Sequence, residues 1–472
     1  MKSNRRDFLR LSGLAGISLV PPAFVKAGTE NEIPLTNFRD PAKHFNMSGY
    51  AAPKLDTVRI GFIGLGQRGP DAVLRMSKIE GVDIKGLCDI RPEKAEAAKQ
   101  SLANTKHKPE IYTGDKDAWK KMVDRNDLDL IYIATPWSLH TPMAVYAMKA
   151  GKHACTEVPA AETIDECWQL VETSESTKKH CMMLENCCYD FFELLTLNMV
   201  RQGLFGELVH AEGAYIHDLV DLNFDKDGYY DMWRLKENFR NGDLYPTHGL
   251  GPIAQALNIN RGDRMDYLTS ISTNDFTMAP HAKELAATDD FFKPYADKTF
   301  RGNMNTMVIR TAKGKTIMVQ HDVSSPRIYS RIHLISGTKG AAIKYPEPGR
   351  INIGHKDWAT EEEMKAFTEK YQPPIVTKVG ELAKQIGGHG GMDFLMDWRT
   401  IDCLRNGLPL DMDVYDAATW SSVGPLSEKS VAKRAMSVDV PDFTQGDWKT
   451  NKPHDVSTLA GGTTKVVIGL EE

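Results

Sequence analysis

The stretch that decides the fold is Val58-Arg-Ile-Gly-Phe-Ile63, followed at once by Gly64-Leu-Gly-Gln-Arg-Gly69. Its first six residues are mostly apolar and are typical of a buried strand. Gly64 allows a tight turn, Gly66 lets the backbone approach a pyrophosphate, and Gly69 permits close packing of the following helix. The N-terminus of that helix offers free N–H groups to phosphates. Strand, glycines and helix in this order predict a dinucleotide-binding βαβ unit.

An acidic residue after the next predicted strand specifies the dinucleotide. Asp89 follows the run Val82–Cys88 and lies 20 residues after Gly69. A carboxylate there accepts hydrogen bonds from both ribose hydroxyls and repels a 2′-phosphate. Arg91 lies close enough to soften this preference for NAD over NADP. The alternative, a glycine-rich turn that binds nothing, explains the strand, the glycines and the acid less well.

The alternation of apolar runs with helical patterns divides the chain. Residues 56–190 alternate in the manner of a parallel sheet covered by helices, which predicts a doubly wound α/β domain of the Rossmann type. Strand-like runs dominate from residue 208, so residues 191–442 are predicted to form an α+β domain on a mainly antiparallel sheet, for substrate binding and oligomerisation. Within it we predict long loops at 218–229 and 278–299, and residues 443–472 form a weakly patterned tail.

The N-terminus has the pattern of an export signal. Residues 1–27 contain Arg5 and Arg6 before an uncharged stretch that ends near Ala27, and residues 28–55 form a polar arm. The stretch resembles a twin-arginine signal and is short and glycine-containing for a membrane span. We expect a periplasmic or extracellular protein without a stable membrane span; the alternative is a frayed terminus with two chance arginines.

Composition excludes several classes of partner. The chain has 472 residues and is 41% hydrophobic, so two domains are expected. It carries 58 basic and 63 acidic residues for a net charge of −5, and no basic face predicts binding to nucleic acid. Its seven cysteines have no metal-ligand spacing and no pairing pattern, so neither a metal site nor a disulfide framework is predicted.

Three further segments carry a family resemblance. They are Ala134-Thr-Pro-Trp-Ser-Leu-His140, Ala150-Gly-Lys-His153 and Glu157-Val158-Pro159. In this order they resemble the glucose–fructose oxidoreductase and inositol dehydrogenase superfamily. Dehydrogenases of that superfamily usually have Glu-Lys-Pro in the third segment, with a catalytic lysine. Val158 takes that place here and cannot move a proton, which weakens the prediction of a plain sugar dehydrogenase.

A second set of segments is more specific. Glu185-Asn-Cys-Cys-Tyr189, Met232-Trp-Arg234 and Asn241-Gly-Asp-Leu-Tyr-Pro-Thr-His-Gly-Leu-Gly-Pro252 resemble glycoside hydrolase family 109, whose known activity is α-N-acetylgalactosaminidase. The resemblance implies NAD contacts from Gln67, Arg68, Asp89, Trp137, Ser138, Leu139, His140, Glu157, Val158 and Asn186. It implies sugar contacts from Tyr215, Arg234, Tyr245, Pro246, Thr247, His248 and Tyr329.

The resemblance also implies an unusual hydrolysis. The sugar is oxidised at C3, the group at C1 is eliminated, water adds, and the sugar is reduced again, so that NAD is restored. The proton transfers suit His and Tyr, and His248, Tyr189 and Tyr245 are the candidate catalytic residues. Tyr245 precedes His248 by three residues, which places both on one side if the turn is helical.

Several assignments stay open from sequence alone. A packed His or Tyr with a satisfied polar tip is the alternative for each catalytic candidate, and for Tyr189 it is equally favoured. Arg234 could form a structural ion pair, His140 could cap the helix that follows it, and Tyr229, Tyr230 and Trp233 could stack on a sugar or fill core space. For the whole chain, the alternatives are a sugar oxidoreductase and a noncatalytic sugar-binding protein that retains NAD. A homo-oligomer is expected because a bare sheet face commonly finds a partner subunit.

Overall fold

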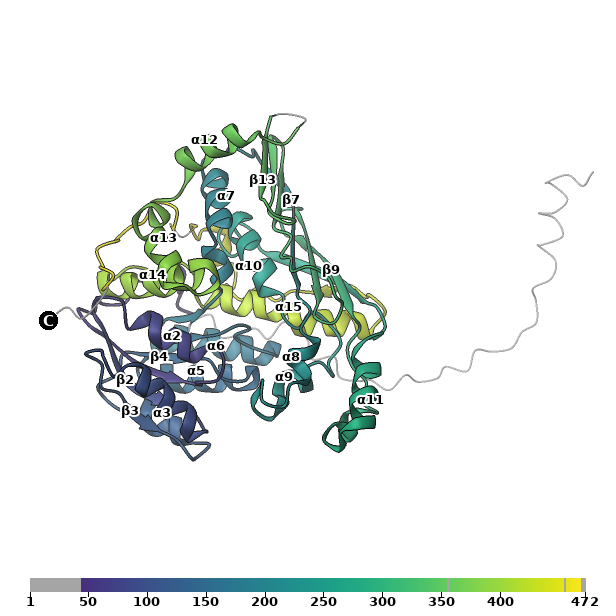
Figure 1. The fold of residues 1–472 in the computed structure, drawn as a ribbon. Helices are drawn as coiled ribbons and strands as arrows, with labels where there is room; N and C mark the ends of the chain where they lie inside the picture. The colour runs from purple at the N-terminus through teal and green to yellow at the C-terminus, as the bar shows by residue number, and fades with distance from the viewer. Residues whose placement is uncertain (1–43, 355–356, 454–455, 468–472) are drawn as a thin grey trace, which may run out of the picture. The chain divides into compact units, whose positions relative to one another are not determined.

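A six-stranded parallel sheet forms the N-terminal part of the computed structural model, which describes residues 44–354, 357–453 and 456–467. Its order is β3-β2-β1-β4-β5-β6, the order of a doubly wound dinucleotide-binding sheet. Figure 1 labels its strands β2, β3 and β4 in the lower part of the view. The strands are β1 Val58–Ile63, β2 Val82–Cys88, β3 Glu110–Tyr112, β4 Leu130–Ile133, β5 His153–Thr156 and β6 Cys181–Met183. The predicted Rossmann sheet is therefore confirmed, with the three-residue edge strand β3 as an addition.

Helices follow the strands of this sheet as predicted. They are α2 Gly69–Met76, α3 Pro92–Ser101, α4 Ala118–Val123, α5 His140–Lys149 and α6 Ile164–Thr177, with short 3-10 turns η2 Trp137–Leu139 and η3 Asn186–Tyr189. α6 begins with a capping box, in which the Thr163 hydroxyl accepts the N–H of Glu166 and the Glu166 carboxylate accepts that of Thr163.

The second sheet has eight strands in the order β13-β12-β11-β7-β10-β9-β8-β14. β7 and β10 pair in parallel and all other neighbours are antiparallel, so the predicted mainly antiparallel sheet is confirmed. The strands are β7 Leu208–Ile216, β8 Met265–Ser272, β9 Met304–Thr311, β10 Thr316–Asp322, β11 Leu334–Gly337, β12 Gly340–Ile343, β13 Arg350–Ile353 and β14 Val438–Asp439.

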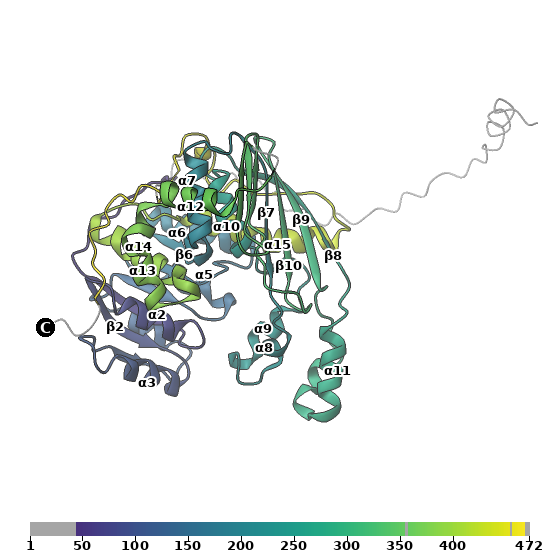
Figure 2. The ribbon, with the colours of Figure 1, turned by 45° about the horizontal axis from the view of Figure 1, so that its top comes forward.

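The predicted loop at 278–299 is wrong. The structure has α11 Met278–Thr288 and the 3-10 segment η5 Asp290–Tyr295 there. The helix begins because the Asp275 carboxylate accepts the N–H groups of Thr277, Met278 and Ala279 at 2.8–2.9 Å. The other predicted loop, 218–229, contains the five-residue helix α8 Val220–Phe224 and leads into η4 Tyr230–Met232 and α9 Trp233–Glu237. In Figure 2, α8, α9 and α11 lie beyond one end of the second sheet.

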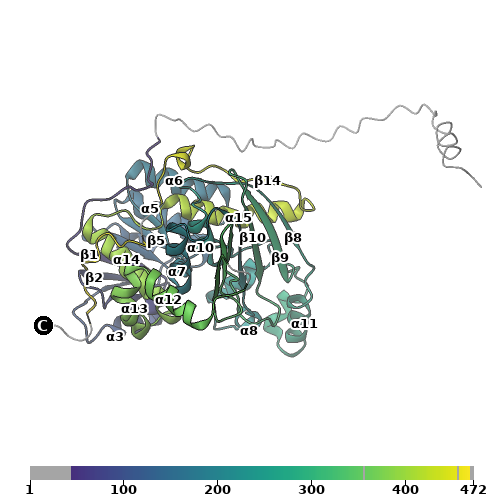
Figure 3. The same cartoon turned by 90° about the horizontal axis from the view of Figure 1, so that it is seen from above.

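The remaining helices belong to the second half of the chain, and α15 contacts strands of both sheets, β6 and β8. They are α7 Phe191–Arg201, α10 Thr247–Ala256, α12 Glu361–Tyr371, α13 Pro374–Ile386, α14 Met392–Asn406 and α15 Val414–Ala432, with short turns η6 His389–Gly391 and η7 Asp447–Lys449. α14 contacts α2 and β1, and α15 contacts α6 on one side and β8 on the other (Figures 1 and 3). The C-terminal helices of the predicted segment 191–442 therefore also complete the cover of the first sheet.

Both ends of the described chain pack on this core. In the arm, the N–H of Met47 donates to the Tyr415 hydroxyl at 3.1 Å. In the predicted tail, Phe443 packs against Trp168 and Val466 forms a bridge with Ile79. The predicted export signal lies outside the described residues. No described helix is long and apolar enough to cross a membrane, and the seven cysteines are buried free thiols.

Candidate active site

The glycine-rich turn between β1 and α2 has the geometry that the sequence predicts. Gly64 has φ +90°, and a Cβ there would lie 2.4 Å from the carbonyl oxygen of Ala134. A Cβ on Gly69 would lie 2.0 Å from the carbonyl oxygen of Gly64. Gly66 is different, because a Cβ there would meet only the Arg91 guanidinium, at 3.4 Å. The first and third glycines therefore build the turn, and the second keeps its outer surface open for a ligand.

Asp89 borders this turn at the end of β2. Its Oδ2 accepts the N–H of Leu65 at 2.7 Å, and its Oδ1 accepts the N–H and Nε–H of Arg91 at 2.9 and 3.2 Å. The carboxylate is thereby fixed beside the open glycine turn, where the ribose of a dinucleotide lies in this fold. Turn and acid together fit NAD.

An ionic network around the buried carboxylate of Asp393 lies next to the glycine turn. Arg68 Nε lies 3.3 Å from Glu157 Oε1, and its NH1 lies 3.1 Å from Asp393 Oδ2. Asn186 donates its amide N–H to the same Asp393 carboxylate. Burial disfavours the charge of Asp393, but a hydrogen bond from His389 and the charges of the neighbouring arginines hold its pKa below the usual range. Two predicted NAD-contacting residues, Arg68 and Asn186, thus meet on Asp393, and a third, Glu157, joins them through Arg68. Asp393 comes from α14 and was missed by sequence reasoning.

The loop after β4 places three more predicted NAD contacts on η2. Trp137 is buried, whereas Ser138 and Leu139 are exposed. The Trp137 ring stacks on Tyr245 with centroids 5.5 Å apart. This loop therefore joins the cofactor side of the site to the residues predicted to bind a sugar.

His140 and Val158 carry no proton chemistry in this structure. The His140 ring is fully buried, with Nδ1 2.7 Å from the carbonyl oxygen of Pro159 and Nε2 2.8 Å from that of Thr135. Burial lowers its pKa, against both hydrogen bonds. Both ring nitrogens are occupied by backbone, so His140 supports the loop. Val158 is 3% exposed.

His248 lies between a carboxylate and a phenol. Its Nδ1 is 2.8 and 3.0 Å from the two carboxylate oxygens of Glu185, and its Nε2 is 3.5 Å from the Tyr245 hydroxyl. The helix α10 begins at Thr247 with Pro246 as its N-cap, so Tyr245 precedes the helix and the two residues do not share a helical turn. Their rings nevertheless lie on one side, with centroids 4.9 Å apart. Thr247 itself is fully buried, and its predicted contact with a sugar stays a prediction.

The glycines after His248 explain how this contact is made. A Cβ on Gly249 would lie 2.2 Å from the backbone nitrogen of Ala214 in β7. A Cβ on Gly251 would lie 2.9 Å from Glu185 Cγ. Only glycine allows α10 to approach both β7 and Glu185 this closely.

Aromatic rings surround His248. The Tyr215 ring lies 4.7 Å from that of Tyr245 and 5.3 Å from that of His248, centroid to centroid. Tyr329 packs edge-on against Tyr215 at 6.3 Å, and its hydroxyl accepts a hydrogen bond from Arg331 at 3.1 Å. The predicted sugar-contacting tyrosines therefore share one cluster with His248.

Arg234 faces the same cluster. Its guanidinium carbon lies 5.2 to 5.5 Å from the ring centroids of Tyr245, Trp137 and Tyr229, and its NH1 donates to the Tyr229 hydroxyl at 3.0 Å. No carboxylate of the described chain pairs with it within 4.0 Å. The alternative of a structural ion pair for Arg234 is therefore not borne out among the described residues.

The segment 228–233 crosses the cofactor loops. Gln67 donates its amide N–H to the carbonyl oxygen of Gly228 at 2.8 Å. The Arg91 guanidinium lies 5.4 Å from the Tyr230 ring centroid, and Trp233 packs against Trp137 at 5.3 Å. Each of the loops after β1, β2 and β4 therefore touches this segment.

A second buried polar layer lies beneath Tyr245, and sequence reasoning missed it. The Asp243 carboxylate accepts the N–H of Tyr245 at 3.2 Å and lies 3.4 Å from His321 Nδ1, and Arg301 NH1 lies 3.2 Å from His321 Nε2. Burial raises the pKa of Asp243 to about 7, against the charge of Arg301 and the N–H of Tyr245. Its Oδ2 has no hydrogen-bond partner among the described protein atoms.

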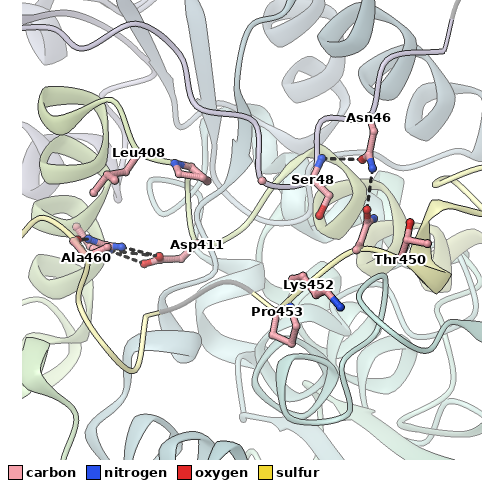
Figure 4. A pocket seen from close by; sticks show the side chains of 12 residues that line it. Asn46, Ser48, Leu408, Asp411, Thr450, Lys452, Pro453 and Ala460 are labelled. Atoms are coloured by element: carbon pink, nitrogen blue, oxygen red, sulfur yellow. Dashed lines mark hydrogen bonds and ion pairs between the residues drawn. The ribbon is translucent and has the colours of Figure 1, made fainter.

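Tyr189 does not join the site. Its side chain is 1% exposed, and its hydroxyl donates to Asp411 at 3.1 Å. Asp411 pairs with Arg399 and lines a separate cavity of about 450 Å³ between the arm and the tail, together with Asn46 and Lys452 (Figure 4). Because its hydroxyl is hydrogen-bonded to Asp411, away from His248, Tyr189 is not a candidate catalytic residue in this structure.

One group of side chains within the described residues has metal-ligand character. Glu185, Cys187 and His248 place one ligand atom each within 4.8 Å of one another. Burial raises the pKa of the Cys187 thiol well above its usual value, and Glu185 is already hydrogen-bonded to His248. We therefore interpret the group as a carboxylate–imidazole pair beside a neutral thiol, and not as a metal site.

Comparison with known families agrees with both halves of this site. A family model described as "Oxidoreductase family, NAD-binding Rossmann fold" matches residues 58–185. A second, described as "Glycosyl hydrolase 109, C-terminal domain", matches residues 189–450, more than half of the chain. One family model thus matches the N-terminal NAD-binding domain, and the other matches the part of the chain that contains Tyr245 and His248.

Whole-chain relatives and solved structures complete the comparison. A glycosyl hydrolase family 109 protein of Shewanella pealeana is 46% identical over 460 residues, covering 96% of this chain and 99% of the relative. An α-N-acetylgalactosaminidase of Shewanella oneidensis is 44% identical over 461 residues, covering 95% and 98%. A levoglucosan dehydrogenase in complex with NADH shares the fold, with a TM-score of 0.61 at 18% identity over 82% of this chain and 100% of that chain. Domain matches and full-length relatives together show that this chain belongs to glycosyl hydrolase family 109.

Proposed function

We propose that this chain removes terminal α-linked N-acetylgalactosamine from glycans, with NAD retained through each cycle. The observation that carries the proposal is the position of His248, which contacts Tyr245 within a ring cluster that includes Trp137 of a cofactor loop. The specificity is supported by the relative from Shewanella oneidensis, which is named α-N-acetylgalactosaminidase and is 44% identical.

NAD, when bound, supplies a reversible oxidation at C3 of the sugar, which makes the C2 proton acidic and allows elimination of the group at C1. The residues that would hold it are those around the glycine turn, Asp89 and the loop after β4. His248 Nε2 faces the ring cluster and acts as the acceptor of a substrate proton, and Tyr245 lies within reach as a proton donor.

The carboxylates of the site do not fit hydrolysis by an ordinary acid–base pair. Such a pair must flank the glycosidic bond. Glu185 is fully buried and bonded to His248, and Glu157 is held by Arg68 and Tyr132. These two carboxylates support the protein rather than the substrate, which favours chemistry that starts from oxidation.

Arg234 offers hydrogen-bond donors to a bound sugar. A guanidinium that is surrounded by rings and lacks a carboxylate partner among the described residues retains N–H donors for uncharged oxygens. Sugar hydroxyls and an acetamide carbonyl are such acceptors, and the rings of Tyr245 and Tyr215 offer faces for a pyranose.

A chromogenic α-N-acetylgalactosaminide tests this function directly. We expect release of the aglycone by the NAD-loaded protein, without net change in NADH absorbance. Net NADH formation from free sugar would instead indicate an oxidoreductase. Binding of the sugar without either reaction would indicate a noncatalytic protein, and absence of aglycone release with NAD confirmed bound would contradict the proposal.

We also propose export through the twin-arginine signal, from Arg5 and Arg6. The expected location is the periplasm or the medium. Changing Arg5→Lys together with Arg6→Lys should leave the protein in the cytoplasm, as measured by fractionation with a marker for each compartment. Equal export of both forms would contradict this assignment.

A homo-oligomer is proposed from the second sheet. Helices α10 and α15 contact one side of it, whereas Ile271 of β8 and Val308 of β9 are 64% and 45% exposed and lie on one face of the strand pair. Burial of such a face by a second copy would remove apolar surface from water. Light scattering should give a larger mass for the natural chain than for the variant with Ile271→Asp and Val308→Asp.

A further inference from the structure

Glu185 is a buried acid at the centre of the site whose role the proposed chemistry leaves undefined. It lies between β6 and η3 and is fully buried. One carboxylate oxygen accepts the backbone N–H of Cys187 at 3.1 Å, and both oxygens lie within 3.0 Å of His248 Nδ1. Burying a carboxylate is costly unless it is hydrogen-bonded and paired, so these contacts demand an explanation.

The contacts define which nitrogen of His248 carries a proton. An ionised carboxylate only accepts hydrogen bonds, so the neutral imidazole must donate Nδ1–H to Glu185. Nε2 is then the unprotonated nitrogen. It faces the Tyr245 hydroxyl and the ring cluster, where a sugar would lie.

The groups around this pair favour the ionised carboxylate. Burial opposes its charge, but the charge that His248 carries when protonated, together with hydrogen bonds from His248 and from the N–H of Cys187, keeps the pKa of Glu185 below the usual value. The other titratable groups that face the pair are the thiols of Cys187 and Cys188, the phenols of Tyr215 and Tyr245, and the imidazole of His217. Burial raises the pKa values of both thiols and both phenols, so these groups stay neutral beside the pair.

We propose that Glu185 is the positioning residue of the site: it holds the Nδ1–H tautomer of His248, aims Nε2 at the substrate and stabilises the imidazolium that forms. This rests on the proposed function. A substrate proton moves to Nε2, and the electron pair of the broken bond stays on the substrate. The positive charge that appears on the ring is then 2.8 Å from a carboxylate oxygen, as in other acid–imidazole pairs. The proton returns to substrate or water later in the cycle.

Glu185→Gln in the NAD-loaded protein tests this role. The amide has nearly the same shape but no charge, so we expect kcat to fall about 10²- to 10⁴-fold, while KM changes less than about threefold. Glu185→Asp keeps the charge and should restore part of kcat.

A matched control and an independent readout separate this proposal from general damage. Glu175 is another buried glutamate that pairs with a histidine, His44 at 3.1 Å, outside the site, and Glu175→Gln should retain natural kcat. ¹⁵N NMR of His248 should show the proton on Nδ1 in the natural chain and a mixture of tautomers in Glu185→Gln. A natural kcat and an unchanged tautomer in Glu185→Gln would overturn the proposal. If the natural chain cleaves no glycoside, the proposed function fails, but the NMR result still decides the role of Glu185.

Discussion

The regions around His140 and His248 both contain a histidine within a family motif, and the structure gives them opposite characters. At the start of α5, His140 is sealed in the core with a backbone carbonyl oxygen on each ring nitrogen. In α10, His248 has a carboxylate on one nitrogen and a phenol at the edge of a ring cluster on the other. Backbone carbonyl oxygens beside both nitrogens make His140 a structural histidine, whereas a carboxylate on Nδ1 of His248 leaves Nε2 available for proton transfer.

The difference between the two regions extends to their energetics. The region of His248 contains buried charges that are only partly compensated, including Asp243 and Arg301 beneath Tyr245. Burial lowers the pKa of Arg301 to about 10, even with Asp243 nearby. Poorly compensated charges near a site reduce stability and are commonly retained for function.

His248→Gln should produce the largest effect. Removal of the imidazole takes away the proton acceptor on Nε2, and we expect kcat for an aryl α-N-acetylgalactosaminide to fall about 10²- to 10⁴-fold. The NAD content of the purified variant should match that of the natural chain, since His248 does not touch the glycine turn or Asp89 in any described hydrogen bond. Activity within tenfold of the natural level would place the catalytic base elsewhere.

Asp243→Asn tests whether the region of His248 is held at a cost to stability. The pKa of Asp243 is raised to about 7, from an ordinary 3.8, so its contribution to stability is present below pH 4 and is lost as pH rises through 7. Between pH 5 and 8 the natural chain should lose about 2 to 3 kcal/mol of unfolding free energy more than Asp243→Asn does. Urea unfolding of both proteins at the two pH values measures this, and parallel pH profiles would contradict the assignment.

His140→Phe should reduce stability and affect turnover much less. The phenyl ring fills most of the space, but it cannot donate the hydrogen bond that the neutral imidazole makes to one of the carbonyl oxygens of Thr135 and Pro159, which costs about 2 kcal/mol in unfolding free energy. We expect kcat per NAD-loaded molecule to stay within about tenfold of the natural value, because the lost bonds are structural. A loss of kcat as large as that of His248→Gln, at unchanged stability, would give the two histidines equal roles.

Much of the fold follows from sequence because its signals are local. Most residues of the strands β1 and β2 are apolar, and the glycine turn follows β1 directly, so strand, turn and helix can be recognised within about 20 residues. The helix α11 was missed because Asp275, which caps three N–H groups, precedes a segment whose Pro280 and Pro294 resemble loop punctuation. The N-terminal cap formed by Asp275 thus allows a helix in a segment whose prolines suggest a loop.

A contact within the candidate site could be predicted from sequence only where one motif contains both of the residues that touch. Tyr245 and His248 are three residues apart and meet at the N-terminus of α10. Asp393 reaches Arg68 from a helix more than 300 residues later, and no spacing rule connects them. Glu185 was visible in a motif, but its role depends on Gly251, which lets α10 approach it. Contacts between distant segments need the fold itself.

Tyr245→Phe gives the smallest expected effect and sharpens the comparison most. The hydroxyl lies 3.5 Å from His248 Nε2, a long hydrogen bond, while the ring stacks on Trp137 and faces Arg234. Loss of the hydroxyl alone should therefore lower kcat about tenfold through the proton transfer and leave the ring contacts intact. Tyr215→Phe is the control, because that hydroxyl contacts His217 at 3.0 Å rather than His248. If Tyr245→Phe lowers kcat no more than Tyr215→Phe does, Tyr245 contributes through its ring contacts alone, and His248 does not need the Tyr245 hydroxyl for proton transfer.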